Sequence, residues 1–491
     1  MCVRDKDLMS VQEVRELIGI SKKAQQELAT KDQAFVDKLC KSIADAGVRN
    51  AERLGRMAWE ETGFGIPEDK TIKNVFGSKS VYDYIKDMKT VGVIDRDEKL
   101  GVTTIAIPLG VIAGIVPSTN PTSTTFYKSL ISIKAGNSII FSPHPSGLNC
   151  ILEATKVIRQ AISEVGGNPD LVSCITIPTR EATNALMSHP DTALILATGG
   201  SAMVHSAYSS GTPALGVGPG NGPAFIDKSA DLKLAVKRIM DSKTFDNGTI
   251  CASEQSIICT TDMVPAVQAE MTAQGAYFLS DAEREQLGRF ILRANGTMNP
   301  QIVGKSVKTI VELAGLTNVP ATARVLVARE DGVGRGHPYS NEKLGPILGF
   351  YTAETVEKAC DCCCEVLFYE GAGHTMSMHT NNPEQVNYFA SRVPVSRLIV
   401  NTPATLGGVG ATTGLMPSFT LGCGAVGGSA TSDNVGPMNL IDRRRVAIGK
   451  MEMEDIRSSV ASVAGSSCAT TACGNVDVDE IVKKIIEKLN A

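Results

Sequence analysis

Short apolar runs rich in β-branched residues alternate with helical patterns along the first half of the chain. These runs cover 111–116, 138–142, 172–177 and 193–197. An alternation of this kind predicts βαβ units on a parallel sheet. We therefore expect an α/β fold that includes a doubly wound domain of the type that binds nucleotides.

A second alternating region follows Lys228. It begins with a helical pattern at 232–240, continues through a loop around Cys251 into a strand at 255–260, and ends near Ala404. A chain of 491 residues is too long for one core of ordinary size. The sequence therefore predicts two doubly wound α/β domains.

Residues 91–107 form an unusual segment between the first helices and the first sheet. Apolar and polar side chains alternate on both sides of a charged turn, which predicts a long β-hairpin with few local packing partners. Because the edges of such a hairpin would stay unpaired in a monomer, we expect it to pair with another subunit. A homo-oligomer, either a dimer or a tetramer, is the expected state.

The C-terminal stretch changes character twice. Residues 458–475 are rich in Ser, Ala, Thr and Gly without apolar periodicity, which predicts a flexible linker. Residues 476–491 carry an apolar stripe typical of one helix face. So short a helix is marginal alone in water, and its stripe needs a partner, either another protein or the chain's own body. The stripe consists of Val478, Ile481, Val482, Ile485, Ile486 and Leu489.

The composition narrows the possible partners. A formal net charge of -4 gives no long-range field that attracts nucleic acid or an anionic membrane. The longest apolar runs are shorter than the ~20 residues that cross a bilayer. The N-terminus carries an amphipathic helix pattern rather than a signal peptide. We therefore expect a cytoplasmic protein with no nucleic-acid or membrane partner.

The thirteen cysteines lack regular spacing, which indicates reduced thiols rather than a disulfide framework. Cys251 differs from most of them because it lies in the polar, glycine-containing segment FDNGTICASEQ rather than in an apolar run. A thiol in such a loop needs only modest activation to act as a nucleophile. The cluster at 360–364 falls in a helical pattern without a second Cys or His pair at ligand spacing, so we expect no metal site.

Two glycine-containing turns are candidates for binding phosphate. At 198–201 a buried strand runs through Thr-Gly-Gly-Ser into a helix, whose free N–H groups can hold a phosphate. A plain strand-to-helix turn remains the alternative at that position. The segment GVGPGNG at 216–222 contains a G-x-G pattern, but it does not lie between a clear strand and a helix. The first turn is the better candidate.

Several motifs, in the expected order along the chain, resemble those of the aldehyde dehydrogenase superfamily. FDNGTICASEQ (245–255) is similar to its nucleophile motif, and VPSTNPTS (116–123) to its Asn-Pro oxyanion segment. FSPHP (141–145) resembles its adenosine-pocket strand end, and TGGSAMV (198–204) its phosphate turn. EKLGPIL (342–348) resembles its ribose-binding Glu-x-x-Gly-Pro motif.

The resemblance implies roles for individual residues. Cys251 is expected to attack an aldehyde carbonyl while its own backbone N–H and the Asn120 side chain hold the oxyanion, and hydride leaves for NAD or NADP. The resemblance also implies a set of cofactor-binding residues. They are Ser118, Thr119, Ser142, Pro143, His144, Thr198, Gly199, Gly200, Ser201, Gly218, Glu342 and Leu344.

The same resemblance guides the division of the chain. We expect a cofactor-binding domain at 1–227, which contains the hairpin, and a catalytic domain at 228–430. The segment 431–450 resembles the tail through which subunits of this superfamily exchange strands.

One departure from the superfamily pattern bears on the reaction. Hydrolytic members carry a general-base Glu upstream of the cysteine, whereas Val217 stands at about that position here, in a stretch without a carboxylate. Without a base to activate water, a thioacyl enzyme waits for another nucleophile. The absence resembles the CoA-acylating aldehyde dehydrogenases, in which coenzyme A takes the acyl group. Ser142 replaces the adenosine-pocket Lys of many relatives, which leaves NAD and NADP both open.

The linker and terminal helix resemble the encapsulation peptides of enzymes in bacterial microcompartments, which dock onto shell proteins. We therefore expect residues 476–491 to bind a shell and the enzyme to lie inside such a compartment. Bifunctional aldehyde–alcohol dehydrogenases have a similar first half but continue into a long reductase domain, so we expect a stand-alone enzyme instead.

The sequence leaves the substrate and two other functions open. Propionaldehyde is slightly favoured over acetaldehyde. The alternatives are a hydrolytic dehydrogenase that releases free acid by means of another base, and an inactive scaffold associated with a shell. The intact Asn-Gly-Thr-Ile-Cys loop and Asn120 disfavour the scaffold.

Overall fold

The structure is a computed structural model and describes residues 5–465. The predicted helix at 476–491 therefore lies outside the described residues. The helices are α1 (Lys6–Leu28), α2 (Gln33–Arg49), α3 (Ala51–Thr62), α4 (Pro67–Val75), α5 (Val81–Ile85), α6 (Pro121–Lys134), α7 (Leu148–Glu164), α8 (Arg180–Ser188), α9 (Ser201–Ser209), α10 (Leu232–Thr244), α11 (Val264–Ala273), α12 (Asp281–Ile291), α13 (Val307–Ala314), α14 (Val356–Tyr369), α15 (Pro383–Ala390), α16 (Ala404–Gly408) and α17 (Met453–Gly465). None of these helices is long and apolar enough to cross a membrane.

The strands form three sheets. They are β1 (Gly92–Asp97), β2 (Val102–Pro108), β3 (Val111–Val116), β4 (Ser138–Pro143), β5 (Val172–Cys174), β6 (Thr192–Thr198), β7 (Ala214–Val217), β8 (Gly222–Ile226), β9 (Glu254–Thr260), β10 (Ala276–Phe278), β11 (Val325–Arg329), β12 (Ile347–Ala353), β13 (Gly373–His379), β14 (Val395–Val400) and β15 (Ile441–Ala447). The predicted run at 172–177 is a strand only over its first residues, because the chain turns toward α8 after Cys174.

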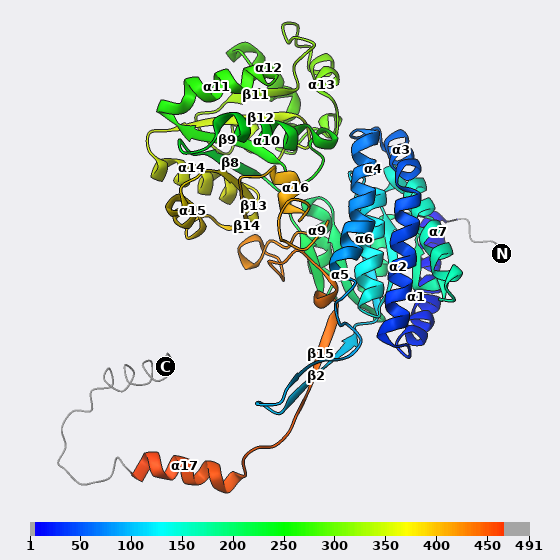
Figure 1. The fold of residues 1–491 in the computed structure, drawn as a ribbon. Helices are drawn as coiled ribbons and strands as arrows, with labels where there is room; N and C mark the ends of the chain where they lie inside the picture. The colour runs from blue at the N-terminus through cyan, green and yellow to red at the C-terminus, as the bar shows by residue number, and fades with distance from the viewer. Residues whose placement is uncertain (1–4, 466–491) are drawn as a thin grey trace. The chain divides into compact units, whose positions relative to one another are not determined.

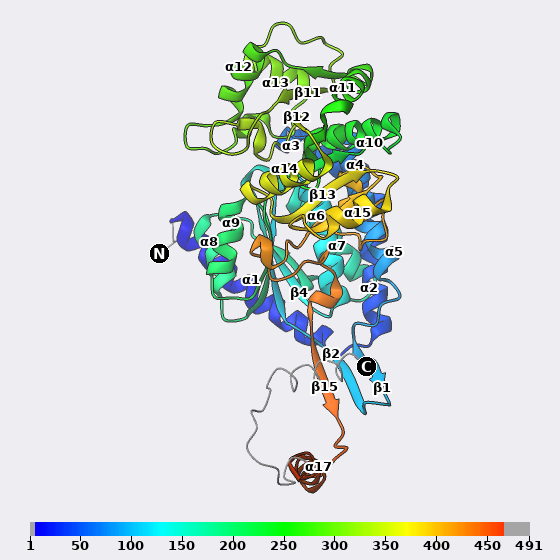
Figure 2. The same cartoon turned by 90° about the vertical axis from the view of Figure 1, so that its left-hand side faces the viewer.

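The first parallel sheet has the order β5-β4-β3-β6-β7, with β3 at its centre. Alternate residues of β3 point to opposite faces: Ile112 joins a core with α2, α6 and α7, and Ala113 joins a core with α1 and α8. Figure 2 shows α8 and α9 on one side of this sheet and α2, α6 and α7 on the other. The predicted doubly wound arrangement is confirmed.

The second parallel sheet has the order β10-β11-β12-β9-β8-β13-β14. Ile257 of β9 packs in a core with α10 and α11, whereas Ile258 faces a core with α14 and α15. Figure 1 shows α10 and α11 beside this sheet, with α14 and α15 below it. Helices thus cover both faces here as well, and β8 and β13 form the point where the strand order reverses.

The strand pairing corrects the predicted division at 227/228. Strand β8 belongs to the second sheet, so that sheet begins at Gly222 rather than after Lys228. Val409 and Phe419, from the end of the segment predicted as the catalytic domain, pack in the core cluster of the first sheet. After it completes the second sheet, the chain packs against the first core again. A single boundary along the sequence therefore cannot separate the two domains.

The predicted hairpin at 91–107 is present as β1 and β2, which join β15 in a three-stranded sheet of the order β1-β2-β15. Among the described residues, 95–104 and 445–465 cluster as a unit distinct from the rest of the chain. Within that unit the Ile448 N–H donates to the Gly101 carbonyl at 3.1 Å.

The predicted linker at 458–475 overlaps α17, which continues to Gly465. This start of the linker is therefore helical. Glu454 and Asp455 stand in the first turn of α17, where acidic side chains stabilise a helix. The Ala residues that suggested a linker also favour a helix, because Ala has the highest helix propensity, and Ser is tolerated there.

Candidate active site

The carboxyl ends of the first sheet open into a cavity of about 960 Å³. At the β3/β6 switch point, β3 leads into Ser118, Thr119 and Asn120, and β6 leads into Thr198 and Gly199. A crevice at such a switch point is the usual ligand site of a doubly wound sheet. All the residues that the sequence proposed for catalysis or cofactor binding line this one cavity.

The turn at 198–201 has the geometry of an anion site. Helix α9 starts directly after Gly200, and among residues 5–465 no side chain caps this end. Uncapped N–H groups and the positive end of the helix dipole favour a phosphate there. The turn therefore fits the dinucleotide that the sequence motifs imply.

The β4 end contributes side chains that are already hydrogen-bonded. Ser142 is buried, and its hydroxyl lies 2.8 Å from the Thr183 hydroxyl across the cavity wall. His144 is exposed, and its Nδ1 accepts a hydrogen bond from the Ser146 N–H at 3.1 Å. Partial desolvation of the ring against the cavity lining lowers the pKa of His144, so this imidazole is neutral at neutral pH. The pocket edge at β4 is polar, and the lining beside it also includes the exposed cation Arg180 at the start of α8.

The amino ends of the second sheet form the opposite part of the lining. Cys251 lies three residues before the start of β9, and Gly218 and Pro219 precede β8. A side chain at Gly220 would place its Cβ 1.8 Å from the Cys251 carbonyl oxygen. Only glycine permits this approach, so the GVGPGNG segment is a packing element beside Cys251.

Cys251 is partly exposed to the cavity and lies beside a histidine. Its Sγ is 3.2 Å from His374 Nε2, and His374 Nδ1 is 3.0 Å from the Thr375 hydroxyl. Burial, with the Arg397 charge, lowers the pKa of His374 to about 3. Burial also raises the pKa of Cys251 to about 12, with Glu342 adding to the shift. The resting pair is therefore a thiol and a neutral imidazole.

The surroundings of Cys251 are less polar than its sequence segment predicts. The segment is polar in sequence, yet Cys251 packs against the first hydrophobic core. Thiolate formation must therefore be coupled to attack on a substrate, with a nearby base taking the proton. The imidazole of His374 is in place for that task.

Arg397 fixes the strand that carries His374. The buried guanidinium donates from Nη2 to the His374 carbonyl at 3.0 Å and from Nε to the Thr375 hydroxyl at 3.2 Å. A second Nη2 bond, 2.7 Å long, reaches the Gly422 carbonyl. Arg397 thereby holds β13 against the segment that returns to the first core, and its charge keeps the imidazole neutral.

Glu342 is a half-buried carboxyl group of the cavity lining. Its Oε1 accepts from the Gly220 N–H at 2.9 Å, and its own N–H donates to Glu370 at 2.7 Å. Burial and then the Glu370 charge raise the pKa of Glu342 to about 8. At neutral pH this group is mostly protonated, so it is a neutral hydrogen-bonding partner rather than a fixed charge.

Asn120 stands where the first sheet meets the cysteine loop. Its Nδ2 lies 3.4 Å from the Thr249 carbonyl and 3.2 Å from the Thr119 hydroxyl, both long hydrogen bonds. The amide group is therefore adjacent to the backbone that leads into Cys251. It can donate to an oxygen that forms beside the sulfur.

Sequence reasoning missed His374 and Arg397, as well as the buried pair Lys73 and Asp246 described below. His374 lies in a strand of the sequence GHTMSMH, 123 residues from Cys251, and no local spacing marks it as functional. The sequence also predicted no metal site. Among the described residues one group, Glu330, Asp331 and His337, brings three potential ligand atoms within 4.8 Å, away from this cavity.

Comparisons with known proteins agree with this geometry. Residues 4–296 match the model of the aldehyde dehydrogenase family. The bifunctional aldehyde-alcohol dehydrogenase of Escherichia coli K12 is 45% identical over 89% of this chain, which spans only 50% of that longer protein.

Two crystal structures share the fold along most of the chain. A probable aldehyde dehydrogenase from Listeria monocytogenes is 61% identical, with a TM-score of 0.91 over 92% of this chain and 100% of that one. An acetylating aldehyde dehydrogenase from Geobacillus thermoglucosidasius is 48% identical, with a TM-score of 0.90 over 92% of this chain and 99% of that one.

Proposed function

Because this chain belongs to the aldehyde dehydrogenase family, we propose that it is a CoA-acylating aldehyde dehydrogenase. It would oxidise a short aliphatic aldehyde to its acyl-CoA with reduction of NAD. The contact of 3.2 Å between Sγ of the cavity residue Cys251 and Nε2 of the buried His374 carries this proposal. The acetylating relatives support the choice of coenzyme A as acceptor.

In the proposed first step the Cys251 sulfur attacks the aldehyde carbon while the thiol proton moves to His374 Nε2. The carbonyl oxygen becomes an oxyanion that accepts hydrogen bonds from the Cys251 N–H and the Asn120 amide group. Such donors are typically worth ~10²–10³ each in rate. When bound, NAD supplies the hydride acceptor that converts the adduct to a thioester.

In the proposed second step the thiol of coenzyme A loses its proton to solvent as its sulfur attacks the carbonyl carbon of the Cys251 thioester, and the Cys251 thiolate leaves. His374 is placed to return the proton to that sulfur. Val217 lines the cavity at the end of β7, where hydrolytic members carry their base. An apolar side chain there cannot activate water, which leaves the thioester to coenzyme A.

The proposed cofactor residues divide by chemistry. Gly199, Gly200 and Ser201 would hold the phosphates at the start of α9, and Ser142 and Pro143 would border the adenosine. Glu342 would bind a ribose hydroxyl. The β4 residues carry no charge, whereas Arg180 adds a cation to the lining, so titration with NAD and with NADP measures the cofactor preference.

A first experiment replaces the thiol. Cys251→Ala should abolish NADH formation from aldehyde and coenzyme A while binding of NAD persists. Cys259→Ala is the matched control, because Cys259 is also buried but lies in the core of the second sheet, away from the cavity. Activity retained by Cys251→Ala would refute the proposed mechanism.

One observation keeps the hydrolytic function as a second candidate. Glu342 and Glu370 both line the cavity, so carboxylates are present although none occupies the usual position. A hydrolytic enzyme would form NADH and free acid without coenzyme A. An inactive scaffold would do neither, so one turnover assay with and without coenzyme A separates all three functions.

We propose propionaldehyde or acetaldehyde as the substrate. The cavity residues beside Cys251, Thr249 and Ile250, carry no charge, which suits an uncharged short chain. Steady-state rates with aldehydes of increasing length, measured with saturating coenzyme A, would identify the preferred one.

We also propose that β1, β2 and β15 contribute to a dimer or tetramer. Residues of β15 after Ile441 are exposed in the single chain. An exposed strand offers unpaired backbone groups to another subunit. Sedimentation that shows only monomer at micromolar concentration would contradict this assignment.

A shell-bound location inside a bacterial microcompartment is a separate proposal, which rests on the sequence of 476–491 alone. A chain cut after Gly465 should keep its activity and oligomeric state but lose co-purification with shells. Ile485→Glu should have the same effect by placing one charge on the apolar stripe. Unchanged shell association of both variants would refute it.

A further inference from the structure

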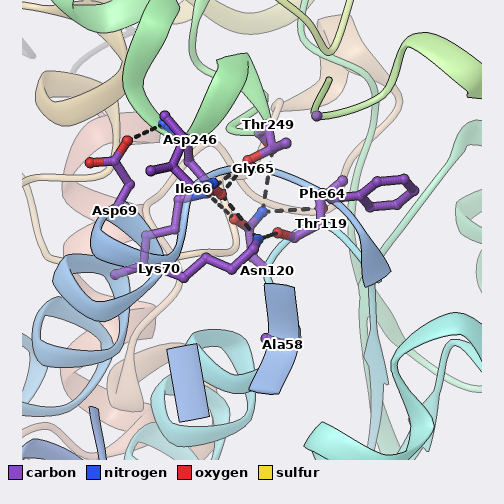
Figure 3. Close-up of polar contacts among 12 residues, drawn as sticks. Ala58, Phe64, Gly65, Ile66, Asp69, Lys70, Thr119, Asn120, Asp246 and Thr249 are labelled. Atoms are coloured by element: carbon purple, nitrogen blue, oxygen red, sulfur yellow. Dashed lines mark hydrogen bonds and ion pairs between the residues drawn. The ribbon is translucent and has the colours of Figure 1, made fainter. Parts of the chain in front are cut away.

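A buried cluster of charged side chains lies next to the proposed oxyanion site. Helix α4 contributes Lys70 and Lys73, which are 3% and 2% exposed, and the loop before Cys251 contributes Asp246, which is fully buried. Figure 3 shows Asp246, Lys70 and Thr249 in one network of polar contacts with Asn120. The mechanism proposed above uses neither lysine.

Asp246 is the centre of this cluster. Its Oδ1 accepts from the Ile66 N–H at 2.7 Å, and its Oδ2 accepts from the Thr249 hydroxyl at 2.7 Å, from Lys70 and from Lys73. The residue is held at φ 47°, a conformation that costs energy for a non-glycine residue. So many interactions on one strained residue indicate that the loop before Cys251 is fixed to α4.

Lys73 reaches from this cluster to Asn120. Its Nζ donates to Asn120 Oδ1 at 2.6 Å and to the Thr249 hydroxyl at 2.8 Å, in addition to the ion pair with Asp246. Its Nζ also lies 5.7 Å from the centre of the Phe245 ring. Lys73 thus connects Asn120, which follows β3, to Asp246 and Thr249 in the loop before Cys251.

The contact with Lys73 determines which way the Asn120 amide points. An ammonium group has only hydrogen-bond donors, so the atom of Asn120 that faces it must be the carbonyl oxygen. The NH₂ group is then forced to the opposite side, toward the carbonyl of Thr249, two residues before Cys251. Without the ammonium, a rotated amide would present its oxygen to the developing oxyanion and repel it.

The positive charge of Lys73 also favours donation from the Asn120 NH₂ group to an oxyanion. Burial lowers its pKa to about 8 against the opposing charge of Asp246, so it remains mostly cationic at neutral pH. A cation bonded to the amide oxygen draws electron density from the nitrogen and strengthens its N–H groups as donors. The effect is greatest in a buried site, where water does not screen it.

We propose that Lys73 is a positioning residue for the proposed reaction, which orients and polarises the Asn120 amide toward the oxyanion formed at Cys251. This role rests on the proposed function. Lys73 acts through Asn120 and touches no reacting atom. Asp246 in turn holds Lys73 in place.

Lys70 provides a matched control on the same helix. It shares the ion pair with Asp246, at 3.2 Å, but its other partner is the Thr119 carbonyl at 3.1 Å rather than the Asn120 side chain. Removing either lysine leaves Asp246 with one fewer cation. Only the removal of Lys73 frees the Asn120 amide.

The test is a double-mutant cycle on kcat with Lys73→Met and Asn120→Ala. Lys73→Met alone should lower kcat by ~10–100-fold, a large part of the value of one oxyanion donor, with little change in the KM of the aldehyde. In the Asn120→Ala background the same substitution should have almost no further effect on kcat. Lys70→Met combined with Asn120→Ala should instead be additive.

Additive effects of Lys73→Met and Asn120→Ala on kcat would overturn the proposal, because a purely structural role acts equally in both backgrounds. Equal losses for Lys70→Met and Lys73→Met would also overturn it. If Lys73→Met does not fold, Lys73→Gln completes the cycle, since it removes the charge and keeps a polar side chain. Wild-type protein without CoA-dependent turnover would refute the proposed function instead, so the two failures are distinguishable.

Discussion

The two parallel sheets contribute opposite ends of their strands to one cavity. The first sheet supplies residues that follow its strands, such as Thr119 after β3 and Gly199 after β6. The second sheet supplies residues at or before the starts of its strands, such as Cys251 before β9 and His374 at the start of β13. The first sheet therefore follows the general rule that ligands bind at the carboxyl ends of parallel strands, whereas the second sheet contributes the amino ends of its strands.

The two ends also differ in chemistry. The first sheet presents glycines, hydroxyls and the uncapped start of α9, which bind through backbone groups and carry no charge. The second sheet presents a thiol, an imidazole and a carboxyl group whose pKa values are all shifted by burial. We propose on this basis that the cofactor binds at the first sheet and that bond making takes place at the second.

The largest effect is expected from His374→Ala. Loss of the proton acceptor beside Cys251 should lower kcat by ~10²–10⁴-fold, the usual value of a general base, while NAD binding measured by titration stays unchanged. His379→Gln is the control, because His379 lies at the far end of β13 and is equally buried. A His374→Ala enzyme with near wild-type kcat would show that the second sheet does not carry the proton transfer.

A smaller effect is expected from Glu342→Gln on the reactivity of the free thiol. The Glu342 carboxylate helps to raise the pKa of Cys251, but it exists only above its own pKa of about 8. Alkylation of Cys251 by iodoacetamide should therefore be faster in the variant than in the wild type above pH 8 and equal below it. Equal rates at all pH values would show that Glu342 does not influence the sulfur.

The smallest effect is expected from Ser142→Ala in the first sheet. Loss of its hydrogen bond with Thr183 should raise the KM of the cofactor by ~2–10-fold, the value of one ordinary hydrogen bond, and leave kcat unchanged. Thr183→Val removes the same bond and should match it. A fall in kcat in both variants would mean that the two sheets do not divide binding and chemistry as described.

The sequence could predict those site residues that belong to local motifs. The turn at 198–201 was identified because a strand, its glycines and the next helix are adjacent in the chain. Cys251 and Asn120 were identified by resemblance to family motifs. Both kinds of signal are local, and the structure brings all of these residues to one cavity.

The residues that the sequence did not reveal are brought to the site by topology. Lys73 meets Asp246 across 173 residues, and His374 meets Cys251 across 123. Each lies in an ordinary amphipathic or apolar pattern, which predicts a helix or strand and nothing more. The domain boundary was misplaced for a related reason: β8 pairs with β13, which is formed far later in the chain.

The central claim is that a Cys251 thioester is released by coenzyme A and not by water. The most direct test measures NADH and acyl products together, with purified enzyme, aldehyde and NAD, in the presence and absence of coenzyme A. We predict equimolar acyl-CoA and NADH when coenzyme A is present, and almost no NADH or free acid without it. Continuous NADH formation with free acid and no dependence on coenzyme A would contradict the account.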